Sequence, residues 1–219
     1  MTDTVFFDLD GTLLDTTYLH TLAWWHGLEE GGERRPMAAI HQLIGMGSSE
    51  LLTELLGRED EAISDAHGRY FAELHPLIRP LPGAADLVRR VAACHADVVV
   101  VTSAKQRDLN ALLGPLGCDD LIDEVVHGEE VERAKPAPDL FNVALERTGA
   151  EPAEVLALGD AVWDVKAAAK AGIGCVAVET GGIDRSRLHD AGAIAVYTTC
   201  THLLDTWDAS PFATLSARR

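Results

Sequence analysis

Val5-Phe6-Phe7-Asp8-Leu9-Asp10-Gly11-Thr12-Leu13-Leu14-Asp15 is a short apolar run that leads into two carboxylates separated by one residue. The run Val5–Phe7 predicts a short buried strand. Side chains two apart on an extended chain point the same way, so Asp8 and Asp10 are expected to address one point beyond the strand. Gly11 permits a sharp turn there. Two close carboxylates repel each other unless a cation or a shared proton offsets their charge. For an isolated pair, a plain polar turn after a strand is the favoured explanation.

The composition limits the classes of function. The chain has 219 residues with 35 acidic and 18 basic side chains, so its formal net charge is −17. Such a chain repels nucleic acid and anionic lipid, and it must bind any anionic substrate through local positive groups. We therefore expect no nucleic-acid partner and no membrane partner, and we leave open whether the chain is a monomer or a dimer.

The cysteines and the N-terminus predict a cytoplasmic protein. No secretory signal pattern and no apolar stretch of about 18 residues is present. The cysteines are widely spaced, which favours buried thiols in a reducing compartment over a framework of disulfides. They are Cys94, Cys118, Cys175 and Cys200.

The pattern of apolar residues changes twice along the chain. Residues 16–79 show helical spacing without a convincing strand, and Ser48 or Ser49 is expected to cap a helix that runs through Leu56. From residue 80 onward strands and helices alternate, which predicts an α/β fold with a parallel sheet. We therefore predict a core domain formed by residues 1–15 and 80–219, with a helical domain inserted at 16–79. Thr201 is expected to cap the final helix, and the chain from about Ser210 is expected to be frayed.

Polar residues follow three of the predicted strands. Thr102 and Ser103 come after the valine run 98–101, and Asp160 comes after the apolar run 155–158. Active sites in parallel sheets lie beyond the carboxyl ends of the strands, so these side chains and Asp8 are expected to converge. Each has an ordinary explanation alone, as a helix cap or a surface group. Their occurrence in this order favours a site.

The motifs together resemble the haloacid dehalogenase superfamily of phosphotransferases. They are DLDGTLLDT (8–16), VVVVTSA (98–104), the lysine of AKPAPD (134–139) and GDAVWD (159–164). The chain most resembles the branch that contains phosphoglycolate phosphatases and β-phosphoglucomutases. The resemblance implies a Rossmann-like parallel-sheet core with an inserted α-helical cap.

The resemblance also implies roles for the acidic residues. Asp8 would be the nucleophile that forms an aspartyl-phosphate, and Asp10 would be the general acid and then the base. Mg²⁺ would be held by the side chains of Asp8 and Asp160 and by the backbone carbonyl of Asp10. Asp164 would support the metal site from behind its ligands.

The phosphate-binding groups follow from the same resemblance. The hydroxyl of Thr102 and the backbone amides near Leu9 and Ser103 would hold the phosphoryl oxygens. Lys135 would supply the positive charge that this acidic chain otherwise lacks. These roles predict a phosphatase acting on a small phosphorylated metabolite, either phosphoglycolate-like or sugar-phosphate-like.

Two alternatives stay open, a β-phosphoglucomutase-like phosphotransferase and a non-catalytic phosphate-binding scaffold. The inserted segment contains no lysine. This argues against phosphonate cleavage, which needs a lysine in the insert to form a Schiff base, and it weakens the mutase hypothesis, which needs cationic residues in the insert for a second phosphate. The intact set of acidic residues and Lys135 disfavours the scaffold. The cations left in the insert are Arg34, Arg35, Arg58, Arg69 and Arg79.

Three features of the insert are candidates for contact with substrate. His20 lies one helical turn past the first motif and either faces the site or packs. The break Gly45-Met46-Gly47-Ser48 is either a specificity loop or a plain connector between helices. Of the adjacent Trp24 and Trp25, at most one faces the cleft, because neighbouring helix positions diverge.

Overall fold

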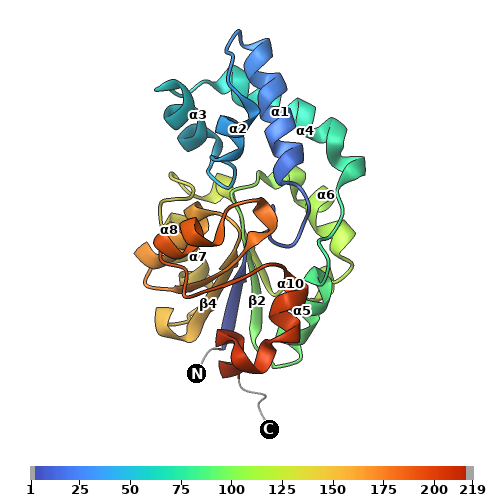
Figure 1. Ribbon diagram of the computed structural model, residues 1–219, viewed down its shortest axis with the longest axis vertical. Helices are drawn as coiled ribbons and strands as arrows, with labels where there is room; N and C mark the ends of the chain where they lie inside the picture. The colour runs from blue at the N-terminus through green and yellow to red at the C-terminus, as the bar shows by residue number, and fades with distance from the viewer. Residues whose placement is uncertain (1–2, 216–219) are drawn as a thin grey trace.

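Short runs of β-branched and aromatic residues form one parallel sheet (Figure 1). The computed structural model describes residues 3–215. Within them the strand order is β3-β2-β1-β4-β5-β6, and every pairing is parallel. The strands are β1 (Thr4–Phe7), β2 (Asp97–Val101), β3 (Glu124–Val126), β4 (Val155–Gly159), β5 (Gly174–Val178) and β6 (Ala195–Tyr197). The predicted α/β class with a parallel sheet is confirmed.

The first strand lies in the middle of the sheet, and its register aligns the strand ends. Phe7, the last residue of β1, pairs with Val100 of β2 on one side and with Leu158 of β4 on the other. The residues that follow these three strands therefore emerge at the same edge. That alignment places the polar residues of the sequence motifs next to one another.

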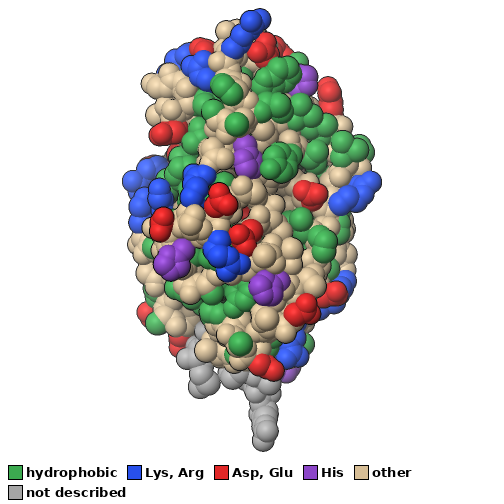
Figure 2. All heavy atoms as spheres, viewed as in Figure 1, with side chains coloured by type: hydrophobic (Ala, Val, Ile, Leu, Met, Phe, Trp, Pro, Cys, Tyr) green, Lys and Arg blue, Asp and Glu red, His purple; other side chains and the backbone are tan. Residues whose placement is uncertain are grey.

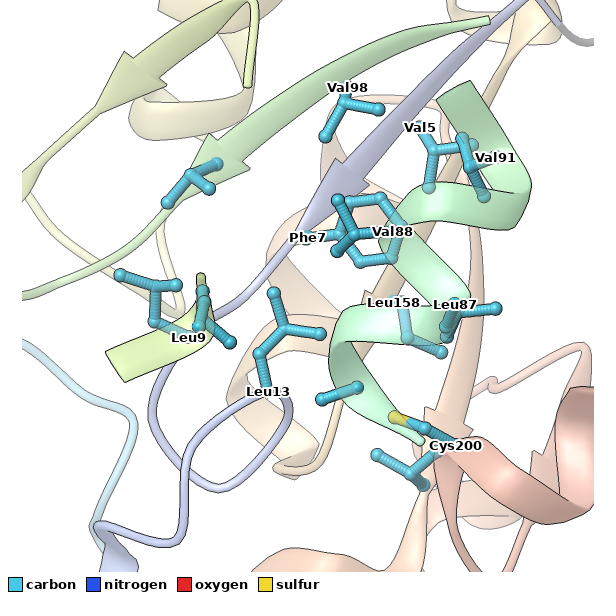
Figure 3. Close-up of a cluster of buried hydrophobic side chains, with 14 of the residues drawn as sticks. Val5, Phe7, Leu9, Leu13, Leu87, Val88, Val91, Val98, Leu158 and Cys200 are labelled. Carbon is cyan, nitrogen blue, oxygen red and sulfur yellow. The ribbon is translucent and has the colours of Figure 1, made fainter. Parts of the chain in front are cut away.

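Alternate residues of β1 point to opposite faces, and each face has its own apolar core. Val5 and Phe7 lie in one buried cluster and Phe6 lies in the other. Figure 3 shows the first cluster, where Val88 and Val91 pack onto Val5 and Phe7. Because both faces are covered, the strands are continuous apolar runs.

Helices cover both faces of the sheet (Figure 1). The cluster that contains Val5 packs under α5 (Ala84–Ala92), α6 (Leu109–Leu113) and α10 (Cys200–Asp205). The cluster that contains Phe6 packs under α7 (Asp139–Thr148), α8 (Val162–Lys170) and α9 (Arg185–Asp190).

Four helices lie together beyond one end of the sheet, at the top of Figure 1, and we call them the helical layer. They are α1 (Thr17–Glu30), α2 (Met37–His41), α3 (Ser48–Leu56) and α4 (Glu61–Leu74). Helices α1 and α4 pack against each other, and the layer has an apolar cluster of its own that includes Trp24, Ile40 and Leu51. The helical layer therefore covers the end of the sheet at which β1, β2 and β4 finish.

The helix caps differ from the prediction. Helix α3 begins at Ser48 after Gly47, so neither Ser48 nor Ser49 caps it. Helix α10 begins one residue before Thr201, and Thr199 is its cap, with its side chain accepting a hydrogen bond from the backbone N–H of His202. A cap must precede the first helical residue, and both helices begin slightly earlier than the sequence pattern suggested.

The prediction of a frayed end from Ser210 is wrong for the described part of the chain. Pro211–Thr214 form a 3₁₀ turn, and Phe212 is completely buried in the core cluster of β1. Its ring packs against Trp207, with the centroids 5.6 Å apart. Two large aromatic side chains gain enough from burial to anchor this segment.

The remaining features are the cysteines, the length of the apolar helices and the distribution of surface charge. All four cysteines are buried and unpaired. Among residues 3–215, no helix combines the length and the apolar character needed to cross a bilayer. On the face shown in Figure 2, acidic and basic side chains are interspersed, so the negative charge does not form one continuous patch there.

Candidate active site

The turn after β1 brings the first motif against the end of β4. The backbone N–H of Asp8 donates to the carbonyl of Leu158 over 2.9 Å, which extends the pairing by one residue. Gly11 then adopts φ +80°, and a Cβ at this position would overlap the carboxylate of Asp160. The turn therefore needs glycine for its backbone angle and for its close approach to Asp160.

Three carboxylates meet where these strands end. Asp8, Asp160 and Asp164 are all buried, and each offers an oxygen within 4.8 Å of the others. The hydroxyl of Thr12 donates to Asp160 Oδ1 over 2.9 Å, and the backbone N–H of Ala161 donates to Asp164 Oδ2 over 3.0 Å. These hydrogen bonds fix the carboxylates in place despite their mutual repulsion.

Among residues 3–215, Lys135 is the single cation inside this cluster, and it is completely buried. Its Nζ lies 2.6 Å from Asp8 Oδ1 and 2.7 Å from Asp164 Oδ1, and it donates to the carbonyl of Val101 over 2.7 Å. Burial alone would lower the pKa of Lys135, but the carboxylates of Asp164 and Asp8 outweigh that effect and raise the pKa. The ammonium group is therefore charged at neutral pH.

The three carboxylates of this cluster carry more negative charge than the ammonium group of Lys135 can offset. Burial, with Asp164 and Asp10 as negative neighbours, raises the pKa of Asp8 to about 7 in spite of Lys135. Burial and the charges of Asp164 and Asp8 raise the pKa of Asp160 well above its ordinary value. A divalent cation would offset this repulsion, and buried carboxylate oxygens are the donors that Mg²⁺ prefers. The donor set of Asp8 and Asp160 therefore fits Mg²⁺.

Asp10 has different partners from Asp8. Its Oδ1 accepts a hydrogen bond from the hydroxyl of Thr16 over 2.6 Å and lies 3.1 Å from Nε2 of His20. Burial alone would raise the pKa of Asp10, but His20, Thr16 and Lys135 together outweigh it and lower the pKa. The two carboxylates of the first motif thus line one cavity in different electrostatic environments.

His20 both faces the site and packs in the helical layer. Its ring stacks on Phe71, with the centroids 3.8 Å apart, and its Nδ1 lies 3.2 Å from Nε2 of His67. His67 stacks in turn on Trp24 at 4.0 Å. Burial, followed by the positive charge near it, lowers the pKa of His67 well below its ordinary value. His67 could not be predicted from the sequence, because nothing near it in the chain points to the site.

A cavity of about 60 Å³ opens between the carboxylates and the helical layer. Thr102 and Ser103 line it from the end of β2, and Gly45, Met46 and Ser48 line it from the loop before α3. Ser103 Oγ donates to the carbonyl of Gly45 over 3.2 Å, so this loop reaches down to the sheet edge.

Some of the other residues singled out from the sequence line that cavity, and some do not. Gly47 borders an adjoining hollow instead, and the side chain of Leu9 is buried in the core. Trp24 lines the cavity, whereas Trp25 does not. One of the two adjacent tryptophans therefore faces the site, and the other packs on the apolar cluster of the helical layer.

The cations that line the cavity come from a loop for which the sequence predicted no role. None of the five arginines of residues 16–79 lines it. Lys105 and Arg107, in the loop after β2, line it instead. Their distance of three and five residues from Thr102 was the available signal, since a loop that follows a strand end borders the site by default.

Comparisons with known proteins agree with this geometry. A family model described as haloacid dehalogenase-like hydrolase matches residues 5–178. A phosphoglycolate phosphatase from Rhodospirillum rubrum is 32% identical, and the match covers 94% of this chain and 90% of that protein. The fructose-1-phosphate phosphatase YqaB from Escherichia coli is 30% identical, with 78% of this chain and 94% of that protein covered. Among solved structures, a hydrolase from Pseudomonas syringae has a TM-score of 0.90 at 32% identity and covers 95% of this chain and 99% of its own.

Proposed function

Because this chain belongs to the family of haloacid dehalogenase-like hydrolases, we propose that it is a Mg²⁺-dependent phosphatase of small phosphorylated metabolites that works through an aspartyl-phosphate on Asp8. The proposal rests on one observation. The buried carboxylates of Asp8 and Asp160 lie close together at one sheet edge, and the buried ammonium of Lys135 contacts Asp8. The relatives named as phosphatases support the same class of reaction, phosphoric monoester hydrolysis.

Asp8 is the proposed nucleophile. An ionised carboxylate needs no base to activate it, but it must approach a phosphoryl group that is itself negative. Lys135 lies 2.6 Å from Asp8 Oδ1 and reduces that repulsion. Attack by a carboxylate oxygen on phosphorus breaks the ester bond and leaves the phosphoryl group on Asp8. A water molecule then cleaves the mixed anhydride and releases phosphate.

The metal site is assigned to residues that follow two strands, β1 and β4. The side chains of Asp8 and Asp160 and the backbone carbonyl of Asp10 would hold Mg²⁺, which when bound supplies positive charge next to the phosphoryl oxygens. Asp164 holds Lys135 and the start of α8 in position through its two oxygens. This assignment gives a role to the buried carboxylate of Asp164, which is not itself a proposed metal ligand.

Asp10 is the proposed general acid and base. Its pKa is lowered in the free protein, so it begins as a carboxylate suited to accept a proton from the hydrolytic water. A phosphate dianion bound beside it raises its pKa, which favours the protonated form needed to protonate the leaving oxygen. His20 holds one oxygen of Asp10 and limits its rotation.

The phosphoryl oxygens are assigned to the residues after β1 and β2. The hydroxyl of Thr102 and the backbone amides of Leu9 and Ser103 would hold them, with Lys135 providing charge. Phosphoryl transfer depends mainly on positioning and on charge stabilisation, which this rigid sheet edge supplies.

The helical layer is proposed to act as a cap that excludes water. We place the core domain at residues 1–15 and 80–219 and the cap at 16–79, since the layer has its own apolar cluster. The contact between Ser103 and Gly45 is one that opening of the cap would break. The cytoplasmic location and the oligomeric state stay predictions.

Release of phosphate from p-nitrophenyl phosphate with Mg²⁺ tests the proposal. We expect wild type to be active, EDTA to abolish the activity, and Asp8→Asn to lower kcat by about four orders of magnitude or more. Acid quenching during turnover of a ³²P-labelled substrate should trap label on wild type and none on Asp8→Asn.

Two results would contradict the proposal. The first is equal activity of wild type and Asp8→Asn on a broad panel of phosphoesters, which would favour a non-catalytic phosphate-binding scaffold. The second is a requirement for a sugar bisphosphate to start turnover, with an isomerised sugar phosphate as product, which would identify a mutase.

A further inference from the structure

The two oxygens of the Asp160 carboxylate have different surroundings. Oδ1 accepts a hydrogen bond from the hydroxyl of Thr12 over 2.9 Å. Oδ2 packs against the backbone of Gly11 and of Gly181, where a Cβ would lie 2.3 Å and 1.7 Å from it. A side chain at either glycine would therefore displace the carboxylate. The backbone approaches Oδ2 closely, and the hydrogen bond from Thr12 leaves this oxygen available to a second donor.

A buried hydroxyl borders the same space. Thr17 is the first residue of α1, and 3% of its surface is exposed. A Cβ at Gly11 would lie 2.4 Å from Oγ1 of Thr17, so this oxygen and Oδ2 of Asp160 border one point. Among residues 3–215, Oγ1 of Thr17 is buried and forms no hydrogen bond. A proposed metal ligand and an unpartnered hydroxyl are therefore neighbours.

Thr21 shows how another buried threonine of the same helix satisfies its hydroxyl. That hydroxyl donates to the carbonyl of Thr17, one turn earlier, over 2.9 Å. Thr17 has no earlier turn of α1 to bond to, because the helix begins with it. A buried hydroxyl without a partner destabilises a protein, and valine would fill the same volume without that cost. A threonine in this place indicates a role in the site rather than in the fold.

A metal ligand needs partners that hold its orientation. A carboxylate turns about its Cβ–Cγ bond unless its oxygens are held, and hydrogen bonds from neighbouring groups commonly hold such ligands. Thr12 holds Oδ1 of Asp160, and Oγ1 of Thr17 is the hydroxyl next to Oδ2. A hydroxyl donates and a carboxylate accepts, so the two groups are complementary. One water molecule can complete such a contact almost as well as a direct hydrogen bond.

We propose that Thr17 is a positioning residue of the metal site, whose hydroxyl holds Oδ2 of Asp160, directly or through one water, and so fixes this carboxylate for Mg²⁺. The inference rests on the proposed Mg²⁺ site and adds a residue of the helical layer to it. Thr17 belongs to α1, whereas Asp160 follows β4. The affinity for the metal therefore depends on the contact between the helical layer and the sheet edge.

Calorimetric titration of the metal-free protein with Mg²⁺ alone tests the inference without turnover. Thr17→Val removes the hydroxyl and keeps the shape of the side chain, so it should raise the Kd for Mg²⁺ by about tenfold or more. Thr17→Ser restores a hydroxyl and should recover most of the affinity. Thr21→Val is the matched control, because it changes another buried threonine of α1, and it should keep the wild-type Kd.

Three results of the titration would overturn the inference. The first is an equal Kd for Thr17→Val and wild type. The second is a Thr17→Ser variant that binds Mg²⁺ as weakly as Thr17→Val, because the hydroxyl would then not be the group that matters. The third is an equal loss of affinity in Thr21→Val, which would show a general disturbance of α1.

Urea unfolding in EDTA separates a role at the metal site from a role in the fold. Thr17→Val removes an unsatisfied buried hydroxyl, so its unfolding midpoint should equal or exceed that of wild type. The same variant should thus bind Mg²⁺ more weakly without being less stable. A midpoint clearly below that of wild type would show that the hydroxyl supports the fold, and it would overturn the inference.

The titration and the phosphatase assay together distinguish failure of this inference from failure of the proposed function. Wild type that binds no Mg²⁺ and releases no phosphate from p-nitrophenyl phosphate would reject both. Wild type that binds Mg²⁺ and hydrolyses the ester, with Thr17→Val binding Mg²⁺ equally well, would reject only the role of Thr17.

Discussion

Nε2 of His20 lies 3.1 Å from Oδ1 of Asp10, and the same imidazole is held by stacking on Phe71 and by contact with His67. His20 belongs to α1 and His67 and Phe71 belong to α4, so the helical layer fixes the orientation of a carboxylate at the end of β1. The proposed acid–base residue is therefore positioned by the layer that covers it.

We predict that His20→Ala lowers kcat by about tenfold or more with a smaller change in KM, because Asp10 loses a partner that orients it. His20→Gln keeps a donor near the position of Nε2 and should recover most of the loss. Steady-state kinetics with Mg²⁺ measures both variants. Equal kcat values for His20→Ala and wild type would show that the contact does not position Asp10.

The second prediction concerns stability without metal. The pKa of Asp8 is raised from 3.8 to about 7 in the folded protein, and that of Asp160 is also raised. Between pH 3.8 and about 7 these carboxyl groups keep protons in the folded state that they have lost in the unfolded state, so their contribution to stability falls as pH rises through that range. Asp10 and Lys135 do not oppose this trend, because their shifts act below and above that range. The lowered pKa of His67 opposes it below about pH 6.5, so the comparison of wild type with Asp8→Asn isolates the contribution of Asp8.

Urea unfolding in EDTA at about pH 5 and about pH 8 measures the effect, which should be on the order of a few kcal/mol. Mg²⁺ favours the ionised carboxylates and should remove most of the difference. Asp8→Asn is the control and should show a smaller pH dependence in EDTA. An equal pH dependence of Asp8→Asn and wild type in EDTA would contradict the prediction.

The third prediction compares two glycines with similar backbone angles. Gly11 and Gly57 have φ values of +80° and +75°, but a Cβ would overlap Asp160 at Gly11 and would meet nothing within 4 Å at Gly57. Gly57→Ala should cost about 1 kcal/mol of stability and keep activity. Gly11→Ala should also displace Asp160, so its activity should fall and the Mg²⁺ concentration for half-maximal activity should rise. Equal activities of the two variants would show that the close approach to Asp160 is not required.

The fourth prediction concerns the C-terminal segment. Phe212 is fully buried against Trp207, so Phe212→Ala should lower the free energy of unfolding by about 3 kcal/mol. Phe212→Leu retains most of the apolar volume and should cost less. Chemical denaturation with Mg²⁺ present measures both. Loss of less than about 0.5 kcal/mol in Phe212→Ala would show that this segment does not stabilise the core.

Much of the candidate site was predictable because it follows strand ends. Asp8, Thr102 and Asp160 each come directly after an apolar run, and the parallel register of β1, β2 and β4 brings such positions to one edge. That rule holds for any sheet of this kind, so it needs no knowledge of side-chain packing. The motif around Gly11 adds the local backbone angle that the turn requires.

The sequence alone thus determined the α/β class, the edge of the sheet that carries the candidate site and the acidic residues that gather at that edge. Only the tertiary structure decided which cations face the cavity, that His67 contacts His20, and that Phe212 closes the core. The physical reason is the range of the interactions. Strand and turn patterns depend on neighbouring residues, whereas these contacts join segments far apart in the chain and depend on how the helices pack.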